Sequence, residues 1–487
     1  MAKLSRRTLL GAVGASVVAA AASPGKTSGQ PQSGQTYKLV REIPVEEGYD
    51  LVVAGGGPAG AAAAISAARL GAKVLLVEAT GCMGGMGTSG LVTMFCPVGD
   101  GERCLTGGLM REYLETLHSR GFLKPGSDPN DWRKQTSVPF NGEGLKLLLD
   151  ELAIGAGVEV RFFTELIDVD ADARAGHVRG VVIQNIEGYH YIRAATFIDG
   201  TGNGVLAKLC GATCREAGRD TPGIMPPILV SLVSGIDWDR IGGQPGMSKN
   251  QQAGLQKAFE DHFFKVLDLF LPGMSQTGHG VGLLNAGHIF NLDALRCKSM
   301  TDGMMAGRRL AQEYTAFYRK YVPGCENLEH VTTAPLMGVR ESRRVLGEYE
   351  LNVADYHARR KFPDQIGVYN YYIDIHPYSP GVQREPDVLM GLGESVGLPY
   401  GMTVPKGWKN LWVAGRCASM DVEVQAAFRV QPAAVMMGQA AGTAAVQSIR
   451  TKRPAGEIDT EVLVATLRKA GAYLPQTETS KTMTRAA

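Results

Sequence analysis

Three glycines and one glutamate early in the 487-residue chain have types and spacing that suggest chemistry. Gly55, Gly57 and Gly60 fit the pattern G-x-G-x-x-G, and Glu78 follows 18 residues after the last of them. The first glycine of this pattern permits a tight turn, the second lets a pyrophosphate approach the backbone, and the third lets a helix pack closely on a strand. An acidic residue at about this distance accepts hydrogen bonds from a ribose. The spacing therefore predicts a dinucleotide-binding site.

The elements that must position these residues lie on both sides of the glycines. Residues 49–54, YDLVVA, are a β-branched apolar run typical of a buried parallel strand. Residues 61–70 are an Ala-rich helical segment, and residues 72–77 are a second apolar strand. Pro58 and Ala59 lie in the turn, where the N-terminus of the helix would face the phosphates. Strand, turn, helix and strand thus occur in the order that a dinucleotide-binding unit requires.

A second glycine-rich loop follows the glutamate. Residues 81–90, GCMGGMGTSG, contain the adjacent pair Gly84 and Gly85. So many glycines would let the backbone approach a second part of the same ligand. The alternative is a flexible surface loop, which the position directly after the predicted ribose-binding acid disfavours.

Another apolar strand runs into glycines in the middle of the chain. Residues 195–204, ATFIDGTGNG, end in a small-residue turn with Asp199, Gly200 and Gly202, and residues 205–209 are helical in character. Such a turn can pass close to a nucleotide. A simple strand, turn and helix would have the same sequence, so this segment alone does not separate the two interpretations.

A similar segment lies near residue 415. Residues 410–415, NLWVAG, form a predicted strand that ends at Gly415, and residues 431–445 form a helix of small residues. This pair would close the dinucleotide-binding domain in three dimensions and direct a helix N-terminus at the ligand. Arg416 and Arg429 could place positive charge beside the ligand or lie exposed to solvent.

Together these segments resemble the FAD-dependent oxidoreductase family whose members share a glutathione-reductase-like flavin domain. The most specific stretches are GGGPAGAAAAISAARLGAKVLLVEA, FIDGTGNG, MGVRESRRVLGEY, YYIDIH and NLWVAGRCAS. The resemblance implies redox chemistry and noncovalent FAD, bound by the glycines, acids and arginines named above. Met86 after the Gly-Gly pair and Asn203 in the DGTGNG turn depart from the residues usual in the family, which leaves those contacts open.

The fold class expected from these observations is α/β. A Rossmann-like dinucleotide (FAD) domain would occupy residues 48–215 and 401–450, with a β-hairpin insertion predicted by the alternating runs in residues 158–192. An α+β substrate or cap domain would occupy residues 216–400, and residues 451–487 would be a C-terminal tail. The cap would wall a cavity that keeps water away from the hydride path.

Histidines in the cap segment are candidates for acid–base chemistry. His376 ends the run YYIDIH, which is predicted as a strand, and Asp374 would share its face. A neutral imidazole could take the proton of an alcohol while the carbon gives hydride to N5 of the flavin. His279 and His288 flank a Gly-rich stretch and are further candidates. A structural, hydrogen-bonded role is the alternative for any one of them.

Four charged residues crowd the segment RESRR. Arg340 and Arg343 could anchor an anionic or polyhydroxy substrate, and together with His376 they are the predicted catalytic residues. Glu341 and Arg344 are predicted to lock an interdomain contact, as Arg-Glu pairs often do.

Residues 1–35 are predicted to be a signal peptide and linker, cleaved near residues 22–30. Arg6 and Arg7 precede a short apolar run, residues 9–22, and this start resembles the twin-arginine export signal. A secretory signal with a chance Arg pair is the alternative. Because FAD would bridge segments far apart in the sequence, the protein is best folded and loaded before export to the periplasm by the twin-arginine machinery.

Charge and cysteine content exclude several classes of partner. The formal net charge is only +2, so nucleic acid is not expected as a partner, and no later stretch predicts a membrane span. The eight cysteines are dispersed, without a CxxC pair, so neither a disulfide scaffold nor a metal site is expected.

The function expected is a periplasmic FAD-dependent dehydrogenase that oxidises an alcohol, with sugars and polyols among the candidates. The electrons would pass to an external non-nicotinamide acceptor, such as a quinone or cytochrome, since no second complete G-x-G-x-x-G unit is present for NAD. One alternative is a reductase of activated C=C bonds, in which paired arginines hold the carboxylate of an enoate. The other is a flavin-binding electron carrier without its own substrate.

Overall fold

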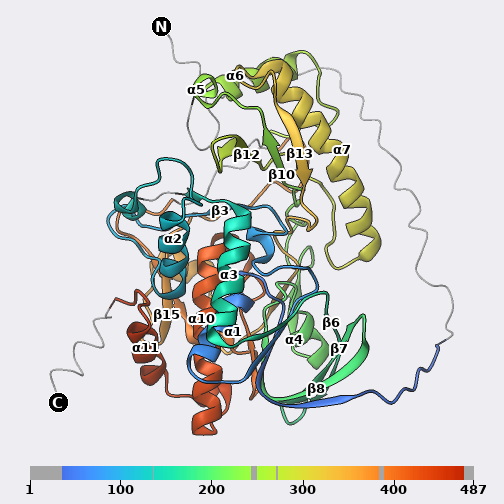
Figure 1. Ribbon diagram of the computed structural model, residues 1–487, viewed down its shortest axis with the longest axis vertical. Coiled ribbons are helices and arrows are strands. Elements are labelled where there is room, and N and C mark those ends of the chain that lie inside the picture. The colour runs from blue at the N-terminus through green and yellow to red at the C-terminus, as the bar shows by residue number, and fades with distance from the viewer. Residues whose placement is uncertain (1–35, 135–136, 243–248, 270–272, 383–388, 476–487) are drawn as a thin grey trace. The chain divides into compact units, whose positions relative to one another are not determined.

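The largest sheet that the structure describes is mostly parallel, and its strands β6 (Glu165–Asp172), β7 (His177–Asn185) and β8 (Gly188–Asp199) are seen in the lower part of Figure 1. Its strands follow the order β5 (Glu159–Arg161), β2 (Val74–Val77), β1 (Val45–Ala54), β8, β7 and β6, and β17 (Leu411–Val413) pairs with β8. The pairs β1–β2, β1–β8 and β8–β17 are parallel. Residues 51–54 of β1 are fully buried, which is the environment that a continuous apolar strand requires.

The computed structural model describes residues 36–134, 137–242, 249–269, 273–382 and 389–475. Ile43–Ala487 form one unit of mutually contacting residues, and Met1–Glu42 belong to another. The predicted signal peptide and linker, residues 1–35, therefore lie outside the described residues. Among the helices that are described, none is both long enough and apolar enough to cross a membrane.

Helices α1 (Pro58–Arg69) and α10 (Gln431–Thr451) pack side by side against the sheet (Figure 1). A Cβ atom at Gly438 would lie 2.0 Å from the carbonyl oxygen of Ala59, and one at Gly442 would lie 2.2 Å from that of Ala63. Only glycine permits such distances, so the two helices meet backbone to backbone. This contact joins the last long helix to the first nucleotide-binding segment.

The remaining elements of the large core surround this helix pair. The helices are α2 (Gly108–Ser119), α3 (Gly142–Ala156), α4 (Val205–Cys210), α8 (Val353–His357), α9 (Val422–Phe428) and α11 (Thr460–Lys469). Three two-stranded sheets complete it: β3 (Met94–Phe95) with β4 (Val138–Pro139), β9 (Cys214–Glu216) with β14 (Arg343–Val345), and β15 (Gln365–Tyr369) with β16 (Val396–Pro399).

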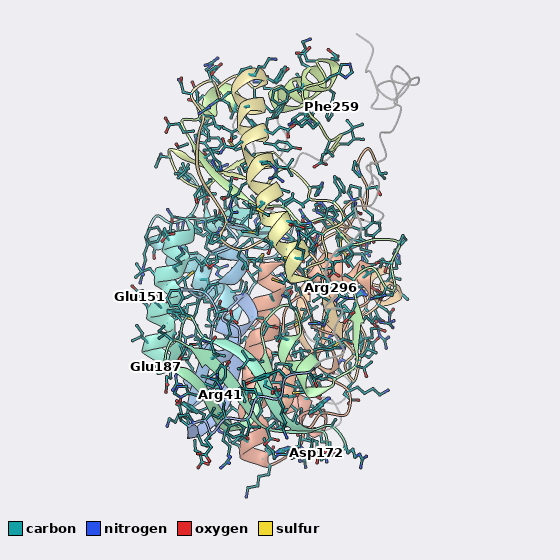
Figure 2. All side chains as sticks on the ribbon, turned by 90° about the vertical axis from the view of Figure 1, so that its right-hand side faces the viewer. Arg41, Glu151, Asp172, Glu187, Phe259 and Arg296 are labelled. Carbon is teal, nitrogen blue, oxygen red and sulfur yellow. The ribbon has the colours of Figure 1, made fainter. Side chains whose placement is uncertain are left out.

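A second, smaller part has its own sheet and its own apolar clusters. Its strands follow the order β11 (Met274–Gln276), β12 (Val281–Leu284), β10 (Ser231–Ser234) and β13 (Glu329–Thr333), and its helices are α5 (Trp238–Ile241), α6 (Lys249–Glu260) and α7 (Cys297–Tyr321). Phe259 lies in this part, whereas Glu151 and Glu187 are exposed around the large core (Figure 2). We call residues 226–339 the cap.

The α/β fold class predicted from the sequence is confirmed, including the antiparallel hairpins of β6, β7 and β8. The domain bounds differ in two places. Phe362, Ile366 and Leu398 pack in the large core, so the cap is shorter than the predicted 216–400. The predicted tail contains α11, whose Leu463 and Leu467 are buried against the same core. Both segments carry apolar residues spaced as on one face of a strand or helix. In the folded protein these apolar side chains pack in the large core.

The strand predicted for residues 371–376 is absent, and this prediction is wrong. Strand β15 ends at Tyr369, and the following backbone joins no sheet. Side chains satisfy its carbonyl groups instead: the hydroxyl of Tyr356 donates to the carbonyl oxygen of Tyr371, and the guanidinium of Arg429 donates to that of Asp374. The segment is held by long-range side-chain contacts that its own sequence does not reveal.

Candidate active site

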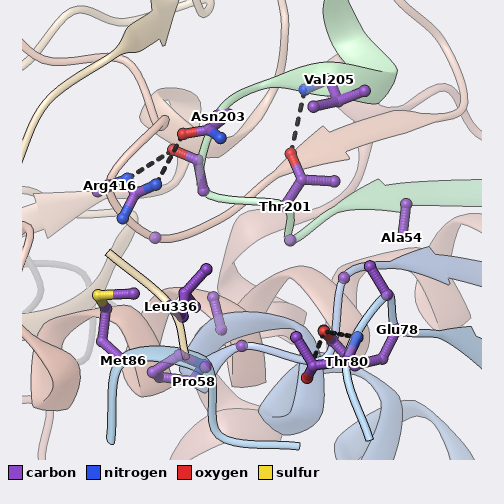
Figure 3. A pocket seen from close by; sticks show the side chains of 18 of the residues that line it. Ala54, Pro58, Glu78, Thr80, Met86, Thr201, Asn203, Val205, Leu336 and Arg416 are labelled. Atoms are coloured by element: carbon purple, nitrogen blue, oxygen red, sulfur yellow. Dashed lines mark hydrogen bonds between the residues drawn. The ribbon is translucent and has the colours of Figure 1, made fainter. Parts of the chain in front are cut away.

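A cavity of about 340 Å³ opens at the carboxyl ends of β1, β8 and β17 (Figure 3). The glycine loops after β1 and β2, the turns after β8 and β17, and the first turn of α10 form most of its wall. Four apolar residues of the cap or its edge close another side: Met300, Leu336, Met337 and Val339. The cavity thus joins segments from three distant regions of the sequence.

Most of the predicted cofactor-binding residues line this cavity, namely Gly55, Gly57, Pro58, Ala59, Glu78, Gly85, Gly200, Gly202, Gly415, Arg416 and Arg429. Gly60, Gly84 and Asp199 are not among the lining residues and instead support the backbone behind it. The carboxylate of Asp199 accepts hydrogen bonds from the backbone N–H groups of Thr201 and Ala207, at 3.0 and 2.9 Å. It therefore shapes the turn before α4.

The glycine loop after β1 fits the phosphate groups of a dinucleotide. Gly55 has φ +88°, and a Cβ atom there would lie 2.8 Å from Cα of Thr201. A Cβ atom at Gly60 would lie 1.8 Å from the carbonyl oxygen of Gly55, so this glycine serves the close packing of helix on strand. At Gly57, in contrast, the nearest atom to such a Cβ would be 3.7 Å away, so a side chain would enter the cavity itself.

Two helix N-termini face the cavity. Helix α1 begins after Gly57 and α10 after Val430; neither has a side-chain cap, and neither has an acidic residue in its first turn. Ala59, Gln431 and Ala434 of these first turns line the cavity. Uncapped N–H groups and two converging helix dipoles favour an anion there, as the pyrophosphate of FAD would be.

Glu78 is held rigidly at the edge of the cavity. Its Oε2 accepts the N–H of Gly56 at 2.6 Å, and its Oε1 accepts both the N–H and the hydroxyl of Thr80 at 2.8 Å. Figure 3 shows Glu78 and Thr80 together at one end of the cavity. A carboxylate oriented in this way can accept hydrogen bonds from a ribose hydroxyl.

Arg416 ties the turn after β8 to the end of the cap. It donates to the carbonyl oxygens of Gly202 and Val339, at 2.8 and 3.0 Å, and to Oδ1 of Asn203 at 2.7 Å (Figure 3). Burial lowers its pKa to about 10, so the guanidinium stays charged at neutral pH. Asn203, which departs from the family pattern, thus has a defined partner.

A continuous chain of polar side chains leads from the cap to Arg429 in the cavity wall, and all of them except the half-buried Asp374 are buried. Nδ1 of His288 lies 3.0 Å from Oδ1 of Asp268, and its Nε2 lies 2.8 Å from Nδ1 of His376. Nε2 of His376 lies 3.3 Å from Oδ2 of Asp374, which also accepts from Arg429 at 3.0 Å. We call Asp268, His288, His376 and Asp374 the polar chain. Arg429 links its end to the cavity.

Charged groups of both signs lie around the polar chain. Burial raises the pKa of Asp374, but His376 and Arg429 outweigh it and hold that pKa well below its usual range. Burial lowers the pKa of Arg340 to about 9, which leaves it charged at pH 7, and its Nη1 donates to the carbonyl oxygen of Pro226 at 2.6 Å. The chain therefore ends, on the cavity side, in an ionised carboxylate.

The three predicted catalytic residues lie in different surroundings. His376 belongs to the polar chain, and Arg340 is close enough to lower its pKa. Arg343 points elsewhere, with its Nε 3.4 Å from Glu216 and its Nη1 3.4 Å from the carbonyl oxygen of Asn203. None of these three residues belongs to the cavity wall that the described part of the chain forms.

Glu341 and Arg344 contact residues outside the cap, so the interdomain lock predicted from the sequence is not seen among the described residues. Glu341 accepts the N–H of Met225 at 2.6 Å, and Arg344 forms an ion pair with Asp220. His279, in contrast, is exposed in the loop between β11 and β12.

Sequence reasoning did not identify Asp268 or Gln431. Asp268 lies in a segment without a recognisable motif, and only its contact with His288 reveals it. Gln431 donates to the carbonyl oxygens of Val92 and Met94, at 2.7 and 3.2 Å, and lines the cavity. Its position at the start of the small-residue helix was the one available signal.

Two solved structures are among those similar to this chain. A geranylgeranyl bacteriochlorophyll reductase-like protein from Thermoplasma acidophilum is 14% identical, with 87% of this chain and 83% of that chain covered and a TM-score of 0.44. A p-nitrophenol 4-monooxygenase from Pseudomonas putida DLL-E4 is 12% identical, with 87% and 81% covered and a TM-score of 0.44. Likeness at this level does not bear on the reaction.

No curated protein sequence matches the chain. The family model described as FAD dependent oxidoreductase matches residues 50–469, which include every segment of the cavity wall and the whole polar chain. The glycine loop, the two helix N-termini and Glu78 fit FAD, which is the cofactor. The chain belongs to the FAD dependent oxidoreductase family.

Proposed function

We propose that this enzyme is a dehydrogenase that oxidises an alcohol, with sugars and polyols as the favoured class. When bound, FAD accepts the hydride from the carbon that carries the hydroxyl. The residues of the chain must then bind the substrate, exclude water and take the hydroxyl proton. The observation that carries the proposal is the ionised carboxylate of Asp374, held between His376 and Arg429 next to the FAD cavity.

Asp374 is suited to accept a proton rather than to donate one. Its Oδ2 is occupied by His376 and Arg429, and its Oδ1 accepts no hydrogen bond from the residues that the structure describes. A low pKa makes it a weak base, but the hydroxyl becomes strongly acidic as the hydride leaves, because the product is a protonated carbonyl. A weak, well-oriented base therefore suffices.

Two tyrosines support a polyhydroxy substrate. The hydroxyls of Tyr371 and Tyr372 lie 3.5 Å apart, and both residues are partly exposed near Asp374. Burial and the charge of Asp374 raise both pKa values, so both hydroxyls stay neutral at pH 7 and can donate or accept hydrogen bonds. Neutral donors and acceptors match sugar hydroxyls better than they match a carboxylate.

Anaerobic titration of the purified, FAD-loaded protein tests the reaction. We expect a member of a panel of alcohols, sugars and polyols to bleach the oxidised flavin absorbance without NAD. Asp374→Asn should lower kcat about 10²- to 10⁴-fold while it retains FAD. The matched control is Asp364→Asn, since Asp364 lies between α8 and β15 in the large core and outside the polar chain. An FAD-loaded protein inert to the whole panel contradicts the proposal.

A reductase of activated C=C bonds is the second candidate, and the nearness of two arginines favours it. Arg340 and Arg429 each face the polar chain, and the charge of Arg429 lowers the pKa of Arg340 after the larger effect of burial. Two such cations could hold the carboxylate of an enoate. Recovery of the oxidised absorbance when an enoate is added to chemically reduced protein would establish this direction and refute the first.

We also propose that the enzyme works in the periplasm after twin-arginine export and passes electrons to a quinone, cytochrome or other carrier. The support is the Arg6-Arg7 pair and the lack of a second complete glycine fingerprint for NAD. Arg6→Lys with Arg7→Lys should leave uncleaved protein in the cytoplasmic fraction, whereas Lys3→Gln should not. Unchanged export of the double variant contradicts the twin-arginine route.

A further inference from the structure

The polar chain contains three hydrogen bonds in a row, and each needs one proton. They join Asp268 to His288, His288 to His376, and His376 to Asp374, at 3.0, 2.8 and 3.3 Å. A hydrogen bond without a proton would place two lone pairs against each other, and one with two protons would place two N–H groups against each other. Three bonds therefore require three protons.

Two ionised carboxylates and two neutral imidazoles supply only two. A carboxylate can only accept, so the outer nitrogens, Nδ1 of His288 and Nε2 of His376, must both carry hydrogen. A neutral imidazole has one N–H, and each ring has then used it. The two inner nitrogens, 2.8 Å apart, would face each other with lone pairs. With both carboxylates ionised, the third proton lies between these two nitrogens.

The groups around the two rings keep this extra charge balanced. Asp268 and Asp374 carry negative charge at the two ends, and Arg340 and Arg429 carry positive charge alongside. The other titratable groups nearby stay neutral at pH 7 because burial raises their pKa values: Cys96, Tyr314, Tyr371 and Tyr372. The backbone N–H of His288 also donates to Asp268 at 2.9 Å, so each oxygen of that carboxylate has a hydrogen-bond partner in His288.

Burial acts against the extra proton. It lowers the pKa of both histidines, and Arg340 lowers them further, whereas the two carboxylates raise them. For either ring considered alone, burial lowers the pKa more than the carboxylates raise it. The two rings, however, are in direct contact through their nitrogens. Two bare nitrogens 2.8 Å apart would repel each other, whereas a shared proton makes this contact a hydrogen bond that a carboxylate flanks at each end. The hydrogen bonds decide the protonation of the pair.

We infer that His288 and His376 share one positive charge as an imidazole and imidazolium pair, and that Asp268 of the cap holds this charge in place. His376 is then not the neutral base that the sequence suggested. It acts through Asp374, to which its N–H donates, and keeps that carboxylate oriented. Asp268 and His288 are positioning residues, contributed by the cap.

The charge on the histidine pair does not depend on which reaction the enzyme catalyses. Its effect on turnover does rest on the proposed alcohol oxidation. Loss of the shared proton as the pH rises would separate the two rings and release Asp374, so kcat/KM should fall above the pKa of the pair. Asp268→Asn removes a negative charge that raises this pKa, and should move the fall in kcat/KM to lower pH by about one to three units.

Nitrogen NMR of the oxidised, FAD-loaded protein with ¹⁵N-labelled histidine measures the charge directly, without substrate. The chain has nine histidines, and His376→Gln assigns the two signals of the pair. We expect three protonated nitrogens shared by His288 and His376 at pH 7. His279→Gln is the control, because it removes one exposed histidine and should leave the pair unchanged.

Two neutral rings at pH 7 would overturn the inference, as would an Asp268→Asn variant whose histidine signals match those of the wild type. Asp268→Glu should restore the wild-type signals at least in part. If the pair is charged but no alcohol is oxidised, the inference stands and the proposed function fails. If an alcohol is oxidised by a protein whose two rings are neutral, the reverse holds.

Discussion

At the FAD cavity, backbone meets backbone, whereas side chains make the contacts of the polar chain. Gly60 rests against the carbonyl oxygen of Gly55, and Gly438 against that of Ala59. In the polar chain, one imidazole meets another at 2.8 Å, and a carboxylate lies at each end. The cavity is therefore sensitive above all to added volume. The polar chain is sensitive to the gain or loss of single protons.

The largest expected effect tests the backbone half of this comparison. Gly60→Val should prevent recovery of folded, FAD-loaded protein, because even its Cβ atom would lie 1.8 Å from the carbonyl oxygen of Gly55. Flavin absorbance and thermal unfolding of the purified protein measure the loss. Gly155→Ala in α3 is the control. No atom lies within 4 Å of the new Cβ atom, and alanine in a helix should raise the free energy of unfolding by about 0.5 kcal/mol. A stable, yellow Gly60→Val protein would contradict the packing described.

The next effect tests the side-chain half through acid stability. The pKa of Asp374 is lowered in the folded protein, so its ion pairs stabilise above the unfolded pKa near 3.8, and this stabilisation is lost as the pH falls toward the folded value. Asp374→Asn should lower the free energy of unfolding by about 3 kcal/mol at pH 7, because Arg429 loses its buried partner. Urea unfolding from pH 7 to pH 3 should show the difference shrinking. A difference that grows with acid contradicts the assigned charge.

A smaller effect is expected at the rim of the cavity. Glu78→Gln keeps the shape of the side chain but replaces one accepting oxygen with an NH₂ group, which faces either Gly56 N–H or Thr80 N–H. We expect FAD affinity to fall about tenfold, equivalent to about 1.4 kcal/mol, measured by titration of the apoprotein. Glu143→Gln, on an exposed position of α3, should bind FAD as the wild type does. Equal affinities of both variants would exclude a role of Glu78 in FAD binding.

The smallest effect separates Arg343 from the polar chain. Arg343 pairs with Glu216 at 3.4 Å and contacts neither histidine, so Arg343→Gln should change kcat less than threefold and lower stability by about 0.5 kcal/mol. Steady-state kinetics with an artificial acceptor and thermal unfolding provide the two readouts. A large loss of kcat with unchanged stability would restore Arg343 to the catalytic residues that the sequence predicted.

The cavity wall could be predicted because its chemistry is local. Gly55 and Gly57 lie in the turn between β1 and α1, and Gly60 lies in the first turn of α1, so their effect needs only the neighbouring strand and helix. The turns after β8 and β17 were found in the same way, each as an apolar run that ends in glycine. Such patterns are visible in sequence because backbone conformation restricts which residues can stand at each position.

The site residues that stayed hidden are those whose partners are distant. Asp374 and His376 were noticed as neighbours, but the strand that should have aligned them does not exist. His288 lies 88 residues before His376, and nothing in either sequence segment shows that their rings meet. A titratable side chain carries no local signature of its partner, since any backbone conformation can present it.

The amino-acid sequence by itself determined the βαβ unit, the α/β fold class and the FAD-binding loops, because strand hydrophobicity and glycine spacing act over short distances. Only the tertiary structure decided where the cap ends, and that Asp268, His288, His376 and Asp374 form one chain beside Arg429. The physical reason is that protonation depends on burial and on the charges within a few ångströms, and these are set when segments from the cap and the large core meet.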